Sequence, residues 1–231
     1  MKRIVFLMAL ISIARPASAH FVFLLPGPAP GEVRVVFNDQ LQVDERIPSE
    51  RLASTRLTIV SPQGGQSTLD WRKEEHHLSA ILPEPRPALV GGVTHYGYAR
   101  SRHTGNKPVL VKYYPKAVLG QVAEVTSLRL GDVARYEIVP VAAEGPLQLR
   151  VLRGSQPTAG VSFSVLTEQE SPAQRGKTDK DGWISASFAK PGRYGVWVKV
   201  IEPTPGEWEG KPYDEVHHFA TLVFDVPESQ P

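Results

Sequence analysis

The sequence predicts an all-β protein made of two consecutive β-sandwich domains, of an immunoglobulin-like or transthyretin-like kind. Three observations predict this fold class. Apolar and polar residues alternate over segments of about five to ten residues, the period of a strand with one buried face. Prolines and glycines, 21 and 19 of the 231 residues, separate these segments and indicate many turns. Helical periodicity is nearly absent after the first 19 residues.

Five strands are expected in the first half of the chain. The segment "HFVFLL" is almost wholly apolar, "GEVRVVFN" follows a Gly/Pro turn, and "TRLTIVSP" alternates until a proline ends it. "HYGYAR" and "PVLVKYYP" are separated by "SRHTGNK" and together predict a hairpin. These strands occupy residues 20–25, 31–38, 55–62, 95–100 and 108–115.

Six further strands are expected after residue 125, where a linker precedes what resembles a new domain start. Their boundaries are marked by Gly/Pro turns, and Asp181-Gly182 is a hairpin signal rather than a calcium loop, because the other calcium ligands are missing. At least eleven strands are too many for one simple sandwich and suit two. The expected domains are residues 20–124 and 125–228, with a short tail at 229–231. The six strands are 134–141, 147–154, 160–167, 182–189, 193–200 and 217–226.

Residues 1–19 have the features of a cleaved signal peptide. Lys2 and Arg3 precede an apolar run from Ile4 to Ala14, and Ala17-Ser18-Ala19 supplies a small-residue cleavage pattern. The apolar run is too short to span a bilayer, and no later stretch approaches the roughly 20 apolar residues of a membrane helix. We therefore expect a periplasmic or secreted protein, cut between Ala19 and His20 and without direct membrane insertion.

Charge and cysteine content exclude several classes of function. Removal of Lys2, Arg3 and Arg15 leaves 23 basic and 24 acidic side chains, so the mature surface gives no reason to expect nucleic acid as a partner. The absence of cysteine excludes disulfides, thiolate metal sites and cysteine nucleophiles. Imidazole and carboxylate groups remain as the main side-chain metal ligands.

His20 is the most informative of the seven histidines. After cleavage it carries a free α-amine, whose ordinary pKa of about 7.7–8.0 leaves part of it deprotonated at neutral pH. Amine and imidazole of one residue can chelate one ion, and nitrogen-rich sets of this kind suit Cu(II) or Ni(II). The alternative is that His20 is only the first polar residue after the signal peptide.

His217 and His218 lie in the last predicted strand, where alternation places them on opposite faces. His218 shares the apolar face with Ala220, Leu222 and Phe224, and His217 shares its face with Phe219, Thr221 and Val223. A buried histidine needs a polar partner. His218 is therefore either a metal ligand or a core histidine with a hydrogen-bond partner, and the sequence leaves both open.

The other histidines are weaker candidates. His95, beside tyrosines at the head of a strand, is a third candidate ligand. His217 and His103 are weaker candidate ligands, and His103 belongs to a hairpin loop and is expected in solvent. His76 and His77 belong to a charged stretch and are expected at the surface.

Four segments together resemble one known family: "AHFVFLLPG", "HYGYARSRHTGNKPVLVKYYPKAV", the stretch from Gly160 to Val200, and "YDEVHHFATLVFDV". The chain resembles the exported domain of unknown function 4198, which is associated with nickel and cobalt uptake. Its second half also resembles the transthyretin-like or carboxypeptidase-regulatory-like sandwich. The resemblance implies two β-sandwiches and a periplasmic role with nickel, cobalt or copper, and it supports His20 and His218 as ligands, with His95 less firmly supported.

Three functions are compatible with these observations. The leading hypothesis is an exported protein without enzyme activity that binds a divalent transition metal ion (Ni, Co or Cu) and supplies a membrane metal transporter or an envelope enzyme. The second is a metal-free module that binds a carbohydrate or protein partner, with Trp208 as the most exposed tryptophan. The third is a copper-dependent oxidase with an N-terminal histidine clamp, near which Tyr96, Tyr98, Tyr113 or Tyr114 would lie.

Overall fold

The computed structural model describes residues 20–84, 86–101, 105–126, 128–141 and 146–228. Four expected features lie outside these residues: the signal peptide, the Ala19 side of its cleavage site, the tail at 229–231, and His103. Within them, strands are the dominant structure, and the helical segments are three short 3-10 turns: η1 (Ser49–Leu52), η3 (Val122–Val125) and η4 (Gly131–Val133). None of the helices in this part of the chain has the length and apolar character needed to cross a membrane. The predicted all-β class is confirmed.

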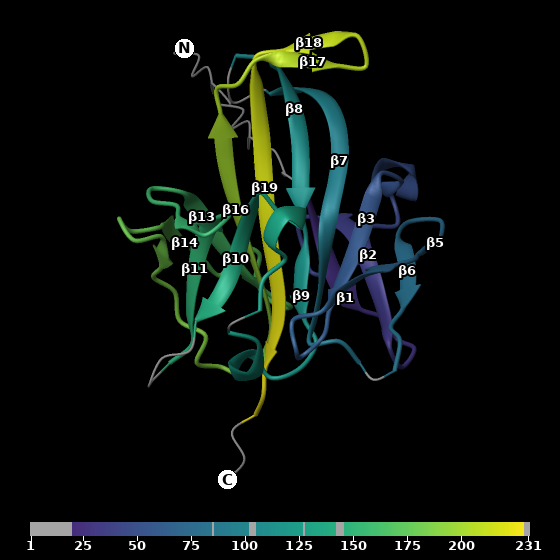
Figure 1. The fold of residues 1–231 in the computed structure, drawn as a ribbon, viewed down its shortest axis with the longest axis vertical. Coiled ribbons are helices and arrows are strands. Elements are labelled where there is room, and N and C mark those ends of the chain that lie inside the picture. The colour runs from purple at the N-terminus through teal and green to yellow at the C-terminus, as the bar shows by residue number, and fades with distance from the viewer. Residues whose placement is uncertain (1–19, 85, 102–104, 127, 142–145, 229–231) are drawn as a thin grey trace, which may run out of the picture.

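A central sheet of nine strands runs through the molecule (Figure 1). Its order is β14-β13-β16-β19-β8-β7-β3-β4, and β9 pairs with both β19 and β7. The strands are β3 (Thr55–Val60), β4 (Gln66–Leu69), β7 (Leu89–Ser101), β8 (Lys107–Tyr114), β9 (Lys116–Val118), β13 (Ser162–Thr167), β14 (Gln174–Lys177), β16 (Gly192–Glu202) and β19 (Glu215–Val226).

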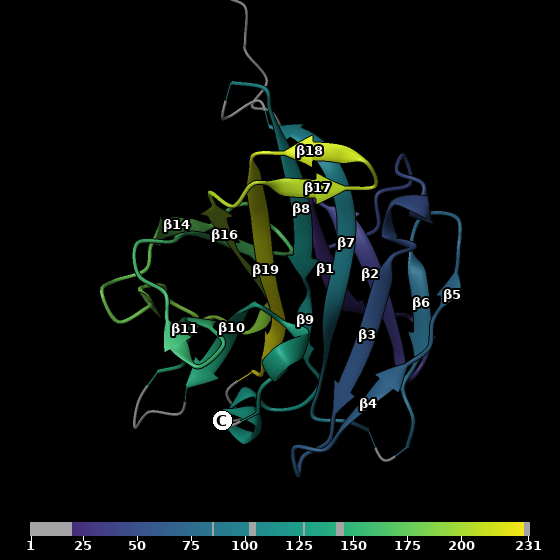
Figure 2. The same ribbon diagram turned by 45° about the horizontal axis from the view of Figure 1, so that its top comes forward.

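Two smaller sheets complete the fold. The N-terminal outer sheet has the order β1-β2-β6-β5, and in the C-terminal outer sheet β10, β12 and β15 attach to β11. A separate hairpin lies at one end of the long strands β7, β8, β16 and β19 (Figures 1 and 2). These strands are β1 (Phe21–Pro26), β2 (Glu32–Asn38), β5 (Arg72–Lys73), β6 (Leu78–Ile81), β10 (Tyr136–Val141), β11 (Gln148–Arg153), β12 (Gln156–Pro157) and β15 (Trp183–Ile184), and the hairpin is β17 (Gly206–Trp208) with β18 (Lys211–Tyr213).

The two outer sheets cover opposite faces of the central sheet. In β19, Val223 joins the core under the N-terminal outer sheet, and the Thr221 hydroxyl donates a 2.8 Å hydrogen bond to the Val22 carbonyl of β1. Leu222 and Phe224, which alternate with them, join the core under the C-terminal outer sheet. The period-two pattern of residues 216–226 therefore predicts the faces of β19 correctly, and it places His217 and His218 on different sides of the sheet.

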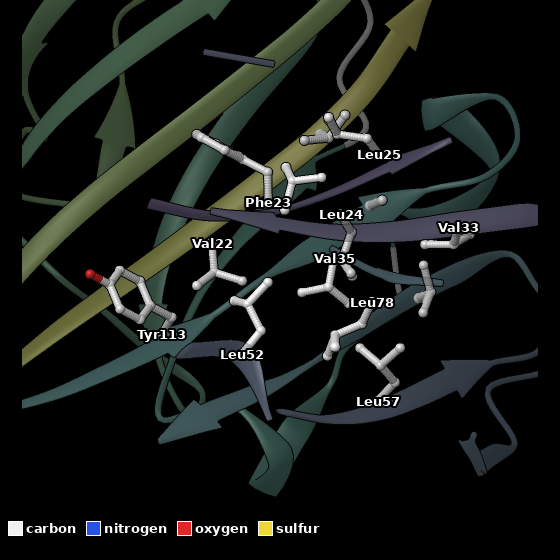
Figure 3. Close-up of a cluster of buried hydrophobic side chains, with 14 of the residues drawn as sticks. Val22, Phe23, Leu24, Leu25, Val33, Val35, Leu52, Leu57, Leu78 and Tyr113 are labelled. Atoms are coloured by element: carbon white, nitrogen blue, oxygen red, sulfur yellow. The ribbon is translucent and has the colours of Figure 1, made fainter. Parts of the chain in front are cut away.

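The core under the N-terminal outer sheet is shown in Figure 3. Phe23 and Leu24 of β1, Val35 of β2, Leu57 of β3 and Leu78 of β6 are almost completely removed from solvent. Full burial of each such side chain contributes about 1.5–3 kcal/mol. Strand β1, which begins immediately after His20, is therefore held firmly against the rest of the fold.

Main-chain pairing joins the two halves of the sequence. Residues Val109–Tyr114 of β8 pair in parallel with Glu215–Ala220 of β19, so one sheet contains strands from both sides of residue 125. The chain is a layered β-sandwich, and the division into two domains at this residue stays a prediction. The expected strand at 182–189 is limited to Trp183 and Ile184.

Candidate functional site

His20 lies at the start of β1, at the edge of the N-terminal outer sheet. Its carbonyl accepts a 3.3 Å hydrogen bond from the Tyr113 hydroxyl of β8. Its ring centroid is 5.4 Å from that of Phe37 in β2. Its side chain is 25% exposed. The backbone and the ring are thus fixed by neighbouring strands while the residue remains accessible to solvent.

Asp44 faces the imidazole of His20, with 3.5 Å between Nε2 of the histidine and Oδ2 of the carboxylate. Arg46 binds this carboxylate through Nε at 2.8 Å and Nη2 at 2.9 Å. The backbone N–H of Arg46 also donates to Oδ1 of Asp44, at 3.0 Å. These bonds outweigh burial and hold the pKa of Asp44 far below its usual range, so the buried carboxylate is ionised at neutral pH.

The two ring nitrogens of His20 have different surroundings. Nε2 faces Asp44, whereas no hydrogen bond to Nδ1 is found among the described residues. A carboxylate beside one ring nitrogen favours the tautomer that carries its proton there. Nδ1 is then left with its lone pair, on the side of the ring from which an α-amine of the same residue can join it in a chelate.

His218 is enclosed on the opposite face of the central sheet. Its Nδ1 lies 2.9 Å from the Tyr114 hydroxyl and its Nε2 lies 3.2 Å from Oε2 of Glu202, although the second contact lacks good hydrogen-bond geometry. The residue is 3% exposed. Burial lowers the pKa of His218 to about 4, against the opposing effect of Glu202. It is a neutral core histidine with its own partners.

The structure does not bring together His20 and His218, the pair expected to share one ion. The imidazole of His20 lies on the side of the N-terminal outer sheet, near Phe37 and Asp44. That of His218 packs against Tyr136 of the C-terminal outer sheet, 5.1 Å between centroids. The central sheet separates them. His217, on the same side as His20, is buried, with its Nε2 3.1 Å from Oε2 of Glu215.

His95, the third candidate ligand, lies in β7. Its ring stacks on Trp208 of the terminal hairpin, 5.8 Å between centroids and 11° between planes, so Trp208 is half-buried rather than the exposed platform expected from sequence. His95 and His218 pair in register with Lys112 from either side. They are therefore two strands, or about 10 Å, apart. This spacing does not suit one ion.

The surroundings of His20 are not evident from the sequence. Within the described part of the chain, no group of three or more His, Asp or Glu side chains is arranged to hold a metal ion. Any ion at His20 would take its protein ligands from that residue and the rest from water or a partner. Of the four tyrosines considered for the oxidase hypothesis, Tyr113 donates a hydrogen bond to the backbone carbonyl of His20. Asp44 has no sequence signal, because it is 24 residues away in a loop.

No family model matches the chain, and comparisons with curated proteins and with solved structures gave no match. The resemblance to an exported metal-associated family therefore stays a prediction.

Proposed function

We propose that this protein, cleaved between Ala19 and His20, is an exported binding protein for a divalent transition metal ion: copper, nickel or cobalt. One observation carries the proposal. The ionised Asp44 carboxylate, fixed by Arg46, faces Nε2 of His20 and leaves Nδ1 free. The protein ligands are the α-amine and Nδ1 of His20.

The surroundings of His20 fit this role. Histidines that bind metals commonly direct their other ring N–H to a carboxylate, which fixes the ring and raises its basicity. Asp44 occupies that position, and the Tyr113 hydroxyl and the Phe37 ring hold the residue on two further sides. The site is built without the histidines of the opposite face.

Two nitrogen ligands leave the remaining coordination positions open. An open site suits exchange with a receiving protein, and nitrogen ligands suit Cu(II) and Ni(II) more than Ca(II) or Mg(II). The proposed role is therefore delivery to a membrane transporter or an envelope enzyme, with no catalytic step.

The test is calorimetric titration of the protein beginning at His20 with Cu(II), Ni(II) and Co(II). A matched protein carries one extra alanine before His20, which turns the amine into an amide and leaves every side chain unchanged. We expect one-to-one binding that the extra alanine weakens at least tenfold. Asp44→Asn, which keeps the shape but removes the charge, should weaken binding about 10- to 100-fold.

A second matched variant addresses the other face of the sheet. His218→Gln should bind metal as the unmodified protein does. Equal binding by the two proteins that differ only by the alanine, or no binding by either, would overturn the proposal.

A further inference from the structure

A cavity of about 730 Å³ opens on the face of the central sheet away from His20. Residues of β3, β4, β7 and β8 line it, together with Arg135 and residues of η4. Val93, Val133 and Trp71 contribute apolar surface. The volume lies in the range of sites that hold small organic molecules.

His95 lines this cavity and carries a buried polar atom without a partner in the described part of the chain. Its Nδ1 is buried and has no hydrogen-bond partner among the described residues. Leaving a buried polar atom without a partner costs about 1–3 kcal/mol, so such atoms in folded proteins usually meet water or a ligand. The stacking of the ring on Trp208 fixes where this nitrogen lies.

The charges closest to His95 are positive. Lys112 and Arg56 line the cavity, and both lower the pKa of His95, after the larger effect of burial. Neither cation has an ion-pair partner in the described part of the chain. The third cation, Arg135, is matched by Glu202, 2.9 Å from its Nε. Asp70 and Asp132 also line the cavity but are exposed.

We propose that this cavity is a second binding site, independent of His20, for a small organic anion whose carboxylate lies between Lys112 and Arg56, beside the ring of His95. Two cations without ion-pair partners among the described residues supply the attraction through charge-assisted hydrogen bonds. The apolar surface of Val93, Val133 and Trp71 accommodates the body of the ligand.

The test uses benzoate and succinate as carboxylate probes. Benzamide, which has nearly the shape of benzoate but no charge, and inorganic phosphate serve as comparisons. The protein is freed of metal with EDTA, which is then removed by dialysis, and titrations at constant ionic strength are followed by calorimetry and by the side-chain ¹⁵N signals of histidine. We expect saturable binding of at least one carboxylate, a shift of the His95 signal, and no shift with benzamide.

Variants locate the site. Lys112→Gln and Arg56→Gln should each weaken carboxylate binding at least tenfold. Lys177→Gln, an exposed lysine of β14 at the other edge of the central sheet, should leave binding unchanged, as should His20→Ala. Circular dichroism verifies that each variant is folded. If replacement of the half-buried Lys112 prevents folding, the variant of the exposed Arg56 tests the site by itself.

Three results would overturn this inference. They are the absence of saturable binding by either carboxylate, binding of phosphate alone, and equal weakening by Lys177→Gln and Arg56→Gln. Because the protein is metal-free and His20→Ala is included, failure here is distinguishable from failure of the metal site.

Discussion

The neighbours of each histidine decide its chemistry in this protein. At His218, Tyr114, Tyr136 and Glu202 surround the ring, and burial lowers the pKa from 6.5 to about 4. The folded state thus disfavours the protonated ring relative to the unfolded chain. The stabilisation is complete above pH 6.5 and is lost as the pH falls from 6.5 through 4.

We therefore predict that His218 makes the free energy of unfolding fall by about 3 kcal/mol between pH 7 and pH 4. Urea unfolding of the protein and of His218→Gln at both pH values measures this contribution, because glutamine does not titrate in this range. The difference between the two pH values should be smaller by that amount in the variant. The same difference in both proteins would show that His218 does not titrate as inferred.

The sequence predicts on which face of a strand a histidine lies, but it does not predict which residues surround the ring. The alternation of residues 216–226 is enough to predict that His218 is buried, because a period of two assigns residues to the faces of a strand without any knowledge of the fold. It gave no means of seeing that Tyr114, 104 residues away, would bind its Nδ1. Asp44 was missed for the same reason, because its position beside His20 depends on a loop that alternation does not describe.

At the scale of elements, the strands that sequence predicted are those with long alternating or apolar patterns. The missed strands are short, such as β5 and β12 with two residues each, and a period cannot be recognised in so few positions. Residues 182–189 show the opposite error, since an alternating pattern there is a strand only at its start.

The pairing of β3 with β7 depends on a glycine. Gly92 faces Leu57 in register, and a Cβ added at Gly92 would lie 2.1 Å from the backbone oxygen of Arg56. Main chain cannot move aside as a side chain can. We predict that Gly92→Ala lowers the free energy of unfolding by about 1–3 kcal/mol, measured by urea unfolding.

Gly120→Ala is the control for this prediction, because its Cβ would be in ordinary contact, 3.6 Å from Oε2 of Glu124. It should change stability by less than about 0.5 kcal/mol. An equal effect of the two substitutions would contradict the close approach at Gly92.

At the scale of the whole molecule, contacts between layers join the two halves of the sequence. Strand β8 pairs with β19, and Lys116 of β9 forms a buried ion pair with Glu137 of β10, 2.5 Å between Nζ and Oε1. Burial lowers the pKa of Lys116, and Glu137 opposes that effect. Breaking such a pair leaves an uncompensated buried charge, which is strongly destabilising.

These connections predict one cooperative thermal transition for residues 20–228. In scanning calorimetry the calorimetric and van't Hoff enthalpies should agree, as they do for a two-state protein. Two separate transitions would contradict this expectation, if limited proteolysis also releases a folded fragment that ends near residue 125.

In the proposed metal site one histidine, His20, binds the ion. Pulsed electron paramagnetic resonance of the Cu(II) complex tests it most directly, because the distant nitrogen of each coordinated imidazole modulates the echo. We expect modulation from a single imidazole, retained in His218→Gln and lost in His20→Ala. Two results would contradict binding by His20 alone. One is modulation from two imidazoles, of which one is lost in His218→Gln, and the other is the absence of any imidazole modulation.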